Sequence, residues 1–148
     1  MTDARVKVLL VEDSDYDAEL ALTALADRCH ANEIVVVGDG EDALDYLYFR
    51  GNYADRPPGN PALIVLDIKM PKVDGLEVLR TIKTDERLKV IPVVMLTSSR
   101  EEKDVVESYR LGSNAYVVKP LVFTEFYEAV RELGTFWLKI NEPFPLNG

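Results

Sequence analysis

The chain has 148 residues, of which 47% are hydrophobic, and this size favours one globular domain. It carries 17 basic and 26 acidic side chains, a formal net charge of −9. Nucleic acid and anionic lipid both bind clustered Lys and Arg, so this charge argues against either as a partner. No apolar run approaches about 18 residues, so we expect no membrane span and a cytoplasmic location.

Short apolar runs rich in β-branched residues alternate along the chain with segments of helical spacing. Such runs, bounded by turn residues, are typical of buried strands. The five expected strands are Val6–Val11, Ile34–Val37, Leu63–Leu66, Val93–Leu96 and Ala115–Val118. The five helical segments that follow them carry Ala18, Leu22 and Leu25; Ala43, Leu44 and Leu47; Leu76, Leu79 and Ile82; Val105, Val106 and Tyr109; and Phe126, Val130, Leu133 and Trp137.

Strict alternation of strand and helix predicts an α/β fold, a flavodoxin-like doubly wound sheet of five parallel strands with helices on both faces. Right-handed crossovers leave few topologies, and the order 2-1-3-4-5 is the one we expect. In such a sheet, functional residues gather beyond the carboxyl ends of the strands where the strand order reverses, here between the first and third strands.

Three local features add detail to this pattern. The fourth helical segment is preceded by Ser99-Arg100-Glu101-Glu102, which predicts a capping box that begins at Ser99. Cys29, the one cysteine, excludes an internal disulfide, and the one histidine, His30, stands beside it. Because no second soft ligand is near, we interpret this pair as helix-end residues close to solvent rather than a metal site.

Two stretches do not fit the simple alternation of strand and helix. Arg50–Pro61 is a polar loop rich in Pro and Gly, which we interpret as a surface insertion or, alternatively, a partner contact. The segment Phe136–Gly148 is unusually apolar for a chain terminus, so we expect it to fold back on the domain or to cover another subunit. We therefore divide the chain into a domain over residues 1–135 and an extension over residues 136–148.

The residues just past the expected strands carry the chemistry. Glu12 and Asp13 follow the first strand, Asp67 the third, Thr97 the fourth and Lys119 the fifth. Three carboxylates gathered at one edge repel one another unless a hard divalent cation lies among them, and Mg²⁺ suits such a site. Because Mg²⁺ takes few carboxylates and leaves positions for phosphate oxygens, the pattern predicts phosphoryl chemistry.

Phosphoryl transfer to a carboxylate fits the other strand-end residues. A carboxylate can act as nucleophile and form an acyl phosphate. Catalysis then consists mostly of alignment and of neutralising the equatorial oxygens, for which Lys119 and the hydroxyl of Thr97 are suited. Each of these residue types alone is common at a strand end. The prediction of phosphoryl transfer depends on their occurring together, at the ends of four strands.

The strand-end motifs VLLVED, LIVLDIKMPKVDG, VVMLTSS and AYVVKP strongly resemble those of the receiver domain of two-component response regulators, of the chemotaxis type. The resemblance runs from about Arg5 to Leu133. It implies that Asp67 accepts a phosphoryl group from a sensor histidine kinase. It also implies that Glu12 and Asp13 hold Mg²⁺ with Asp67, and that Lys69 gives its backbone carbonyl to the metal.

The same resemblance assigns a conformational switch. Thr97 and Tyr116 match the hydroxyl and the aromatic ring that move when the family's phosphoacceptor is modified. Lys119 matches the lysine that neutralises the phosphoryl group, and Gly75 matches the glycine that opens the third helix. The implied activity is that of a signalling protein with self-phosphorylation and autodephosphorylation only, not of an enzyme with a separate substrate.

The long loop and the extension, with its FWL and EPFP sequences, resemble a narrower group of regulators. These are single-domain regulators paired with phytochrome-type photoreceptor kinases, and they are often dimeric. The implied dimer face combines the fourth helical segment, the strand Ala115–Val118, the fifth helical segment and the extension, in which Phe136, Trp137 and Phe144 are the expected contacts.

Two positions depart from the family pattern. Lys69 places a cation where many relatives carry a neutral residue, and with Ser99 it lies where an attacking water would approach. We expect Lys69 to change the lifetime of the acyl phosphate, either by shielding it from water or by stabilising the hydrolytic transition state. Val122 replaces a common acidic cap, which weakens the start of the fifth helix unless Thr124 caps it.

Two other functions compete with the phosphorylation switch. An aspartate-nucleophile phosphohydrolase usually has a second carboxylate two residues after its nucleophile, where this chain has Lys69. A binding module that only keeps the fold would have lost an acid, the Thr or the Lys, and none is missing. A nucleotide or flavin site is not expected, because no Gly-rich phosphate loop follows any strand.

Overall fold

The computed structural model describes residues 6–145. Residues 1–5 of the expected domain and 146–148 of the expected extension lie outside the described residues. The strands are β1 (Val8–Val11), β2 (Ile34–Val37), β3 (Leu63–Leu66), β4 (Val93–Thr97) and β5 (Ala115–Val118). The helices are α1 (Asp15–Leu25), α2 (Gly40–Leu47), α3 (Gly75–Thr84), α4 (Glu102–Leu111) and α5 (Phe123–Thr135).

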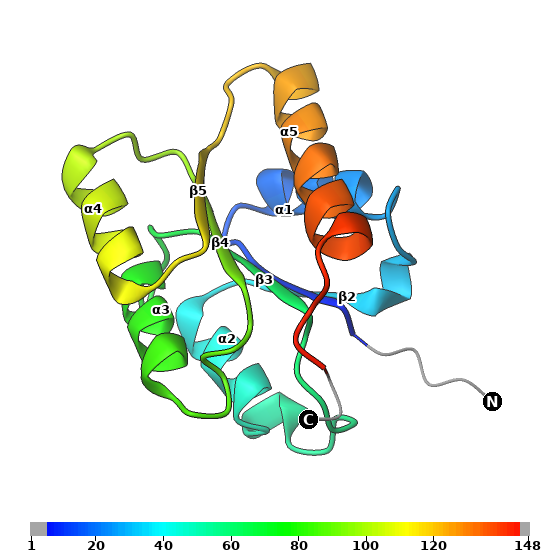
Figure 1. Ribbon diagram of the computed structural model, residues 1–148, viewed down its shortest axis with the longest axis vertical. Helices are drawn as coiled ribbons and strands as arrows, with labels where there is room; N and C mark the ends of the chain where they lie inside the picture. Colours follow the sequence, from blue (N-terminus) through cyan, green and yellow to red (C-terminus); the bar gives the residue numbers. More distant parts are fainter. Residues whose placement is uncertain (1–5, 146–148) are drawn as a thin grey trace.

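The strands form one parallel sheet in the order β2-β1-β3-β4-β5, which confirms the predicted fold class and topology (Figure 1). The first strand is shorter than expected, because it begins at Val8 rather than Val6. Lys7 is still tied to its neighbours, since its N–H donates to the Glu33 carbonyl and its own carbonyl accepts from Ala62 and Leu63.

Helices cover both faces of the sheet, with α1 and α5 on one side and α2, α3 and α4 on the other (Figure 1). Successive side chains of a strand point to opposite faces. Leu9 and Leu66 therefore pack under α2 and α3, whereas Leu10 and Val65 pack under α1 and α5. Because both faces are buried, the central strands are apolar at every position rather than at alternate ones.

The helices begin in two different ways. Ser14, Asp39 and Asp74 are N-caps of α1, α2 and α3, and each side chain accepts a hydrogen bond from a backbone N–H of the first turn. The capping box expected at Ser99 is wrong, because α4 begins after Glu101 with no side-chain cap. The Ser99 hydroxyl donates to the buried Asp104 carboxylate, and its oxygen accepts from the Glu101 N–H at 3.3 Å rather than from a first-turn N–H of α4.

The start of α5 also has no side-chain cap. Its N-cap is Val122, and Thr124 lies inside the first turn, so Thr124 does not cap the helix. At the other end, a π-type turn, η3 (Phe136–Ile140), continues α5 into the extension. Gly134 of α5 lies against Leu25 of α1, which holds the two helices close together.

Arg56 packs at the centre of the insertion between α2 and β3. The guanidinium of Arg56 lies between the rings of Tyr46 and Phe49, 3.9 and 3.8 Å from their centroids. Its Nε donates to the Tyr46 carbonyl and its Nη1 to the Gly59 carbonyl. The loop therefore has a small core of its own, stabilised by cation–π contacts.

We expect Arg56→Ala to lower the free energy of unfolding by about 1–2 kcal/mol, because it removes two cation–π contacts and the hydrogen bonds to backbone carbonyls. Urea unfolding measures this loss. Arg50→Ala is the control, since Arg50 lies 5.1 Å from the Tyr48 centroid and is more than half exposed. Equal losses in the two variants would show that the Arg56 stack does not order the loop.

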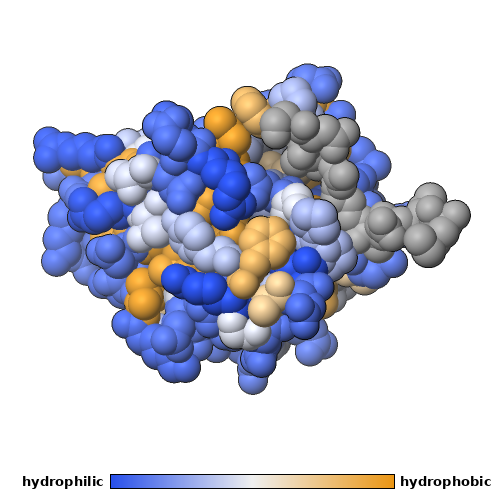
Figure 2. All heavy atoms as spheres, turned by 90° about the horizontal axis from the view of Figure 1, so that it is seen from below, coloured by the Kyte–Doolittle hydropathy of each residue, from blue (hydrophilic) through white to orange (hydrophobic). Residues whose placement is uncertain are grey.

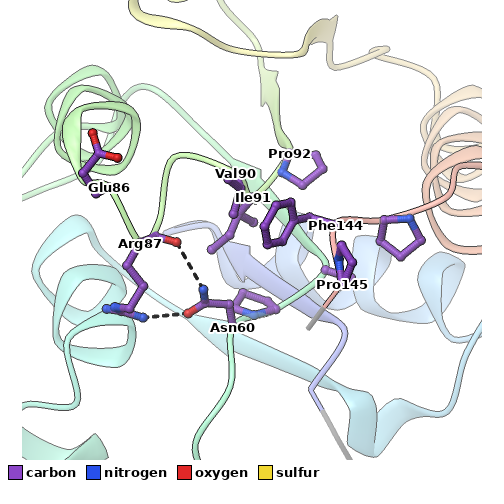
Figure 3. A pocket seen from close by; sticks show the side chains of 11 residues that line it. Asn60, Glu86, Arg87, Val90, Ile91, Pro92, Phe144 and Pro145 are labelled. Atoms are coloured by element: carbon purple, nitrogen blue, oxygen red, sulfur yellow. Dashed lines mark hydrogen bonds between the residues drawn. The ribbon is translucent and has the colours of Figure 1, made fainter. Parts of the chain in front are cut away.

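The described part of the extension lies along the domain (Figure 3). After η3 the chain passes along the base of the sheet, where Phe144 and Pro145 lie beside Ile91 and Pro92 (Figure 3). They border a cavity of about 230 Å³ that Asn60 of the insertion also lines. The view from below shows separate apolar spots on a largely hydrophilic surface (Figure 2).

Within residues 6–145, every helix falls short of the length and apolar character that crossing a bilayer requires. Cys29 and His30 follow α1 at the edge of the molecule, as expected, and His30 is exposed. Burial raises the pKa of the Cys29 thiol, which keeps it protonated at neutral pH.

Candidate functional site

The expected site residues meet at the carboxyl edge of the sheet. The backbone N–H of Glu12 donates to Val37, and that of Asp67 donates to Val11, so each residue extends a parallel ladder by one step. The N–H of Lys119 donates in the same way to the Thr97 carbonyl. Because these residues continue their strands, their side chains start from fixed positions at neighbouring strand ends.

Lys119 is the centre of the site. Its Nζ lies 2.7 Å from Glu12 Oε1, 2.9 Å from Asp17 Oδ2 and 3.0 Å from Asp67 Oδ2. The lysine, Glu12 and Asp67 are all buried. An ammonium has three N–H donors, and these contacts occupy all of them.

Asp17 is a member of the site that sequence reasoning missed. It lies in the first turn of α1, where its backbone N–H donates to the Ser14 hydroxyl. The spacing of Asp17 in the sequence could have revealed it. Because α1 starts shortly after Glu12 and Asp13, its first turn brings Asp17 back to the carboxyl edge of the sheet.

The pKa values of Glu12 and Lys119 are strongly shifted from their ordinary values. Burial raises the pKa of Glu12 to about 7, and the nearby Asp67 carboxylate adds to the rise, against the opposing hydrogen bond from Lys119. Burial acts to lower the pKa of Lys119, but its contacts with Glu12, Asp17 and Asp67 outweigh this and raise the pKa above its usual range. The lysine is thus a permanent cation within an excess of negative charge.

This excess of negative charge suits a divalent cation. Glu12, Asp13 and Asp67 each offer one carboxylate oxygen, and the three oxygens lie within 4.8 Å of one another. Asp13 is exposed, which gives the cluster an open side. Hard oxygen donors select cations such as Mg²⁺, Mn²⁺ or Ca²⁺, so the residues present fit the metal that was expected.

The backbone around Asp67 is packed tightly. A Cβ atom on Gly75 would lie 1.9 Å from the Asp67 carbonyl oxygen, so only glycine fits at the start of α3. The Gly75 N–H donates to the Ile68 carbonyl, and the Ile68 N–H donates to Asp67 Oδ1 at 2.7 Å. This packing fixes the carboxylate that faces Lys119.

The two expected switch residues are joined through the loop after β4. Thr97 is fully buried, and its Oγ1 accepts from the Ser99 N–H at 3.4 Å. The Tyr116 hydroxyl donates to the Ser99 carbonyl at 3.0 Å, and the Ser99 hydroxyl donates to Asp104 on α4. Ser99 therefore contacts Thr97, Tyr116 and Asp104 of α4.

The other predicted positions lie outside this cluster. Lys69 is exposed, two residues beyond Asp67. Phe136 and Phe144 of the extension are 46% and 50% exposed. Trp137 packs edge-on against Phe136 and against the core under α1 and α5, so it contributes to its own domain.

Comparisons with known proteins identify the family of this chain. The family model described as "Response regulator receiver domain" matches residues 8–131. Response regulator Rcp1 from Synechocystis sp. is 40% identical over 132 residues, which are 89% of this chain and 88% of Rcp1.

Solved structures match over most of their length. The crystal structure of the phosphorylated cyanobacterial phytochrome response regulator RcpA has a TM-score of 0.89 and 40% identity, covering 95% of this chain and 99% of that one. The bacteriophytochrome response regulator AtBRR has a TM-score of 0.72 and 57% identity, covering 93% and 99%. The Mn²⁺-bound form of Rcp1 has a TM-score of 0.86 and 38% identity, covering 94% and 99%. The chain belongs to the response regulator receiver domain family.

Proposed function

We propose that this protein is a single-domain response regulator that accepts a phosphoryl group on Asp67 and transmits the change through a protein-interaction face. The observation that carries the proposal is the contact of the buried Lys119 ammonium with Asp67, beside the acidic cluster of Glu12 and Asp13. A buried carboxylate with a fixed cation and an open side is suited to nucleophilic attack on phosphorus.

The reaction is the transfer of one phosphoryl group. An oxygen of Asp67 forms a bond to phosphorus while the bond from phosphorus to the donor, a histidine nitrogen or the acetate oxygen of acetyl phosphate, breaks. The donor leaves with the bonding electrons, and the product is an acyl phosphate. Water later attacks phosphorus, which releases inorganic phosphate and restores the carboxylate.

Each residue of the site has a proposed part in this step. Glu12, Asp13, Asp67 and the backbone carbonyl of Lys69 would hold Mg²⁺, which when bound neutralises charge on the phosphoryl oxygens. Lys119 neutralises a second oxygen as a point charge. The Mn²⁺-bound form of the related Rcp1 supports a divalent metal at this edge.

The switch follows from the added charge. A phosphoryl group brings a charge of about −1.5 to −2 and new acceptor oxygens, which attract the Thr97 hydroxyl. Movement of Thr97 shifts Ser99, whose carbonyl holds the Tyr116 hydroxyl. Tyr116 then turns inward, and the surface of α4, β5 and α5 changes shape, so phosphorylation shifts the population toward the active state.

We infer that the phosphodonor is a sensor histidine kinase of the phytochrome type. RcpA is titled a phytochrome response regulator and AtBRR a bacteriophytochrome response regulator, and this chain is 40% and 57% identical to them. We place the protein in the cytoplasm, where a reduced, unpaired cysteine such as Cys29 is usual.

The test of the proposed function is phosphate incorporation from acetyl phosphate, followed by intact mass. We expect one phosphoryl group per chain with Mg²⁺ and none after chelation with EDTA. The same assay separates the two rival functions. A phosphohydrolase would turn over added phosphate esters, and a binding module of the same fold would take up no label in either condition.

The lifetime of the acyl phosphate tests Lys69. Because this exposed cation stands two residues beyond Asp67, we expect Lys69→Asn to change the decay rate of the phosphorylated protein. Slower decay in the variant shows that the lysine stabilises the hydrolytic transition state, and faster decay shows that it shields the phosphate with Ser99. Lys72→Asn is the control, since Lys72 pairs with Asp39 and Glu41 instead. Equal decay rates in the wild type and both variants would show that Lys69 does not affect the lifetime of the acyl phosphate.

We propose that the protein forms a homodimer through α4, β5, α5 and the extension. Exposed apolar side chains on these elements support this face, namely Val106, Tyr109, Phe136, Ile140 and Phe144. We expect Phe136→Ser to shift the sedimentation of the protein toward monomer. Val36→Ser is the control, because Val36 is also exposed but lies on β2, at the edge of the sheet opposite β5. Unchanged sedimentation of Phe136→Ser would argue against this dimer.

A further inference from the structure

Lys119 is shared among three carboxylates, although the proposed reaction needs it at only one. Its contacts with Glu12 and Asp67 belong to the strand-end motifs. The third contact, to Asp17 Oδ2 at 2.9 Å, comes from α1. The lysine therefore has no free N–H donor for a new anion unless one of these contacts is released.

Asp17 is the contact most easily released. Its side chain is 26% exposed, whereas Glu12 and Asp67 are 3% and 7% exposed, so water can replace the lysine at Asp17 at the smallest desolvation cost. Its backbone is held by the Ser14 cap in the first turn of α1, where the helix dipole favours a negative charge. Asp17 thus remains a fixed, charged acceptor whether or not the lysine is bound to it.

We propose that Asp17 is a positioning residue that restrains Lys119 in the unphosphorylated protein and competes with the phosphoryl group for it. This inference rests on the proposed function, because it assigns a regulatory part to a residue beside the same site. On phosphorylation, Lys119 gives up its contact with Asp17 and turns that donor to a phosphoryl oxygen. The contact with Asp17 therefore lowers the affinity of the site for a phosphoryl group.

Beryllofluoride, which forms a phosphoryl-like adduct on a carboxylate, measures this competition without chemical turnover. We expect Asp17→Asn to bind beryllofluoride about threefold to tenfold more tightly than the wild type, with Mg²⁺ present, because a neutral amide is a weaker acceptor than a carboxylate. Asp15→Asn is the matched control. Asp15 lies in the same turn of α1, is exposed and carries the same charge, but it is not among the ion-pair partners of Lys119.

A second readout follows the lysine itself. The ¹⁵N resonance of the Lys119 ammonium should move in Asp17→Asn and stay in place in Asp15→Asn, with no ligand added. Asp17→Glu restores the charge and should return the beryllofluoride affinity toward the wild-type value. A purely structural role for Asp17 in α1 would leave both readouts unchanged once the variant is folded.

The outcomes separate this inference from the proposed function. If the wild type binds beryllofluoride and both Asn variants bind it with equal affinity, Asp17 acts only through its net charge and the inference fails. Weaker binding by Asp17→Asn also overturns it, since the contact would then help to hold Lys119 in the active position. Absence of beryllofluoride binding and of phosphorylation in the wild type would refute the proposed function itself.

Discussion

Asp67→Asn takes up no phosphate from acetyl phosphate in the presence of Mg²⁺, whereas the wild type takes up one group per chain. An amide oxygen is a poor nucleophile, and an acyl phosphate cannot form on it without loss of the amide nitrogen. The substitution also removes one of the charges that Lys119 and a divalent metal balance, so we expect metal affinity to fall together with phosphorylation.

The variant should nevertheless fold. The oxygen of the introduced amide can keep the hydrogen bond that the Ile68 N–H donates in the wild type; the amide NH₂ cannot accept from Lys119, which keeps Glu12 and Asp17 as its partners. Loss of the Asp67 charge also relieves its repulsion of Glu12, one of the causes that raise the pKa of that carboxyl to about 7. We therefore expect the free energy of unfolding without metal to stay equal to that of the wild type or to rise.

Asp85→Asn is the matched control for this experiment. Asp85 is half-buried, and its carboxylate also accepts a short side-chain hydrogen bond, from the Tyr48 hydroxyl at 2.6 Å. It is the C-cap of α3, at the end of that helix away from the carboxyl ends of the strands, so the variant should keep full incorporation. Label retained in Asp67→Asn would place the phosphoacceptor elsewhere, and label lost in Asp85→Asn would show that the assay reports folding rather than chemistry.

The strand-end residues could be predicted from sequence because their positions follow from the parallel ladder. Once β1, β3, β4 and β5 are recognised as apolar runs, Glu12, Asp67, Thr97 and Lys119 must start at one edge of the sheet. Their placement needs no knowledge of side-chain conformation. The fold class and strand order were predicted on the same basis, since periodicity and right-handed crossovers decide both.

Features that depend on tertiary contacts could not be predicted in this way. The capping box at Ser99 failed because α4 begins two residues later, with Glu101 at its N-cap, while Ser99 is held by the Glu101 N–H and the Asp104 carboxylate. Asp17 was missed because its contact with Lys119 depends on where α1 begins. The stack of Arg56 requires Phe49 in a left-handed conformation, with φ of 57°, which a sequence pattern does not reveal.

Gly75→Ala should lower the free energy of unfolding by about 3 kcal/mol or more, because the added methyl group collides with backbone rather than with a movable side chain. The new Cβ would lie 1.9 Å from the Asp67 carbonyl oxygen and 2.7 Å from the Ile68 Cα. No rotamer change relieves such a contact. Either α3 moves away from β3, or the backbone that carries the Asp67 carboxylate moves, so we expect slower phosphorylation as well.

Substitutions at two other glycines serve as controls for Gly75→Ala. Gly38→Ala adds a methyl group with no atom within 4 Å, so urea unfolding should show a change of no more than about 1 kcal/mol. Gly40→Ala places its Cβ 1.9 Å from the Val73 carbonyl oxygen, so it should destabilise the protein about as much as Gly75→Ala. Its clash does not involve the backbone of Asp67, however, so the fraction that remains folded should incorporate phosphate at the wild-type rate. If Gly40→Ala slows phosphorylation as much as Gly75→Ala does, the packing of Gly75 against Asp67 has no special part in positioning the phosphoacceptor.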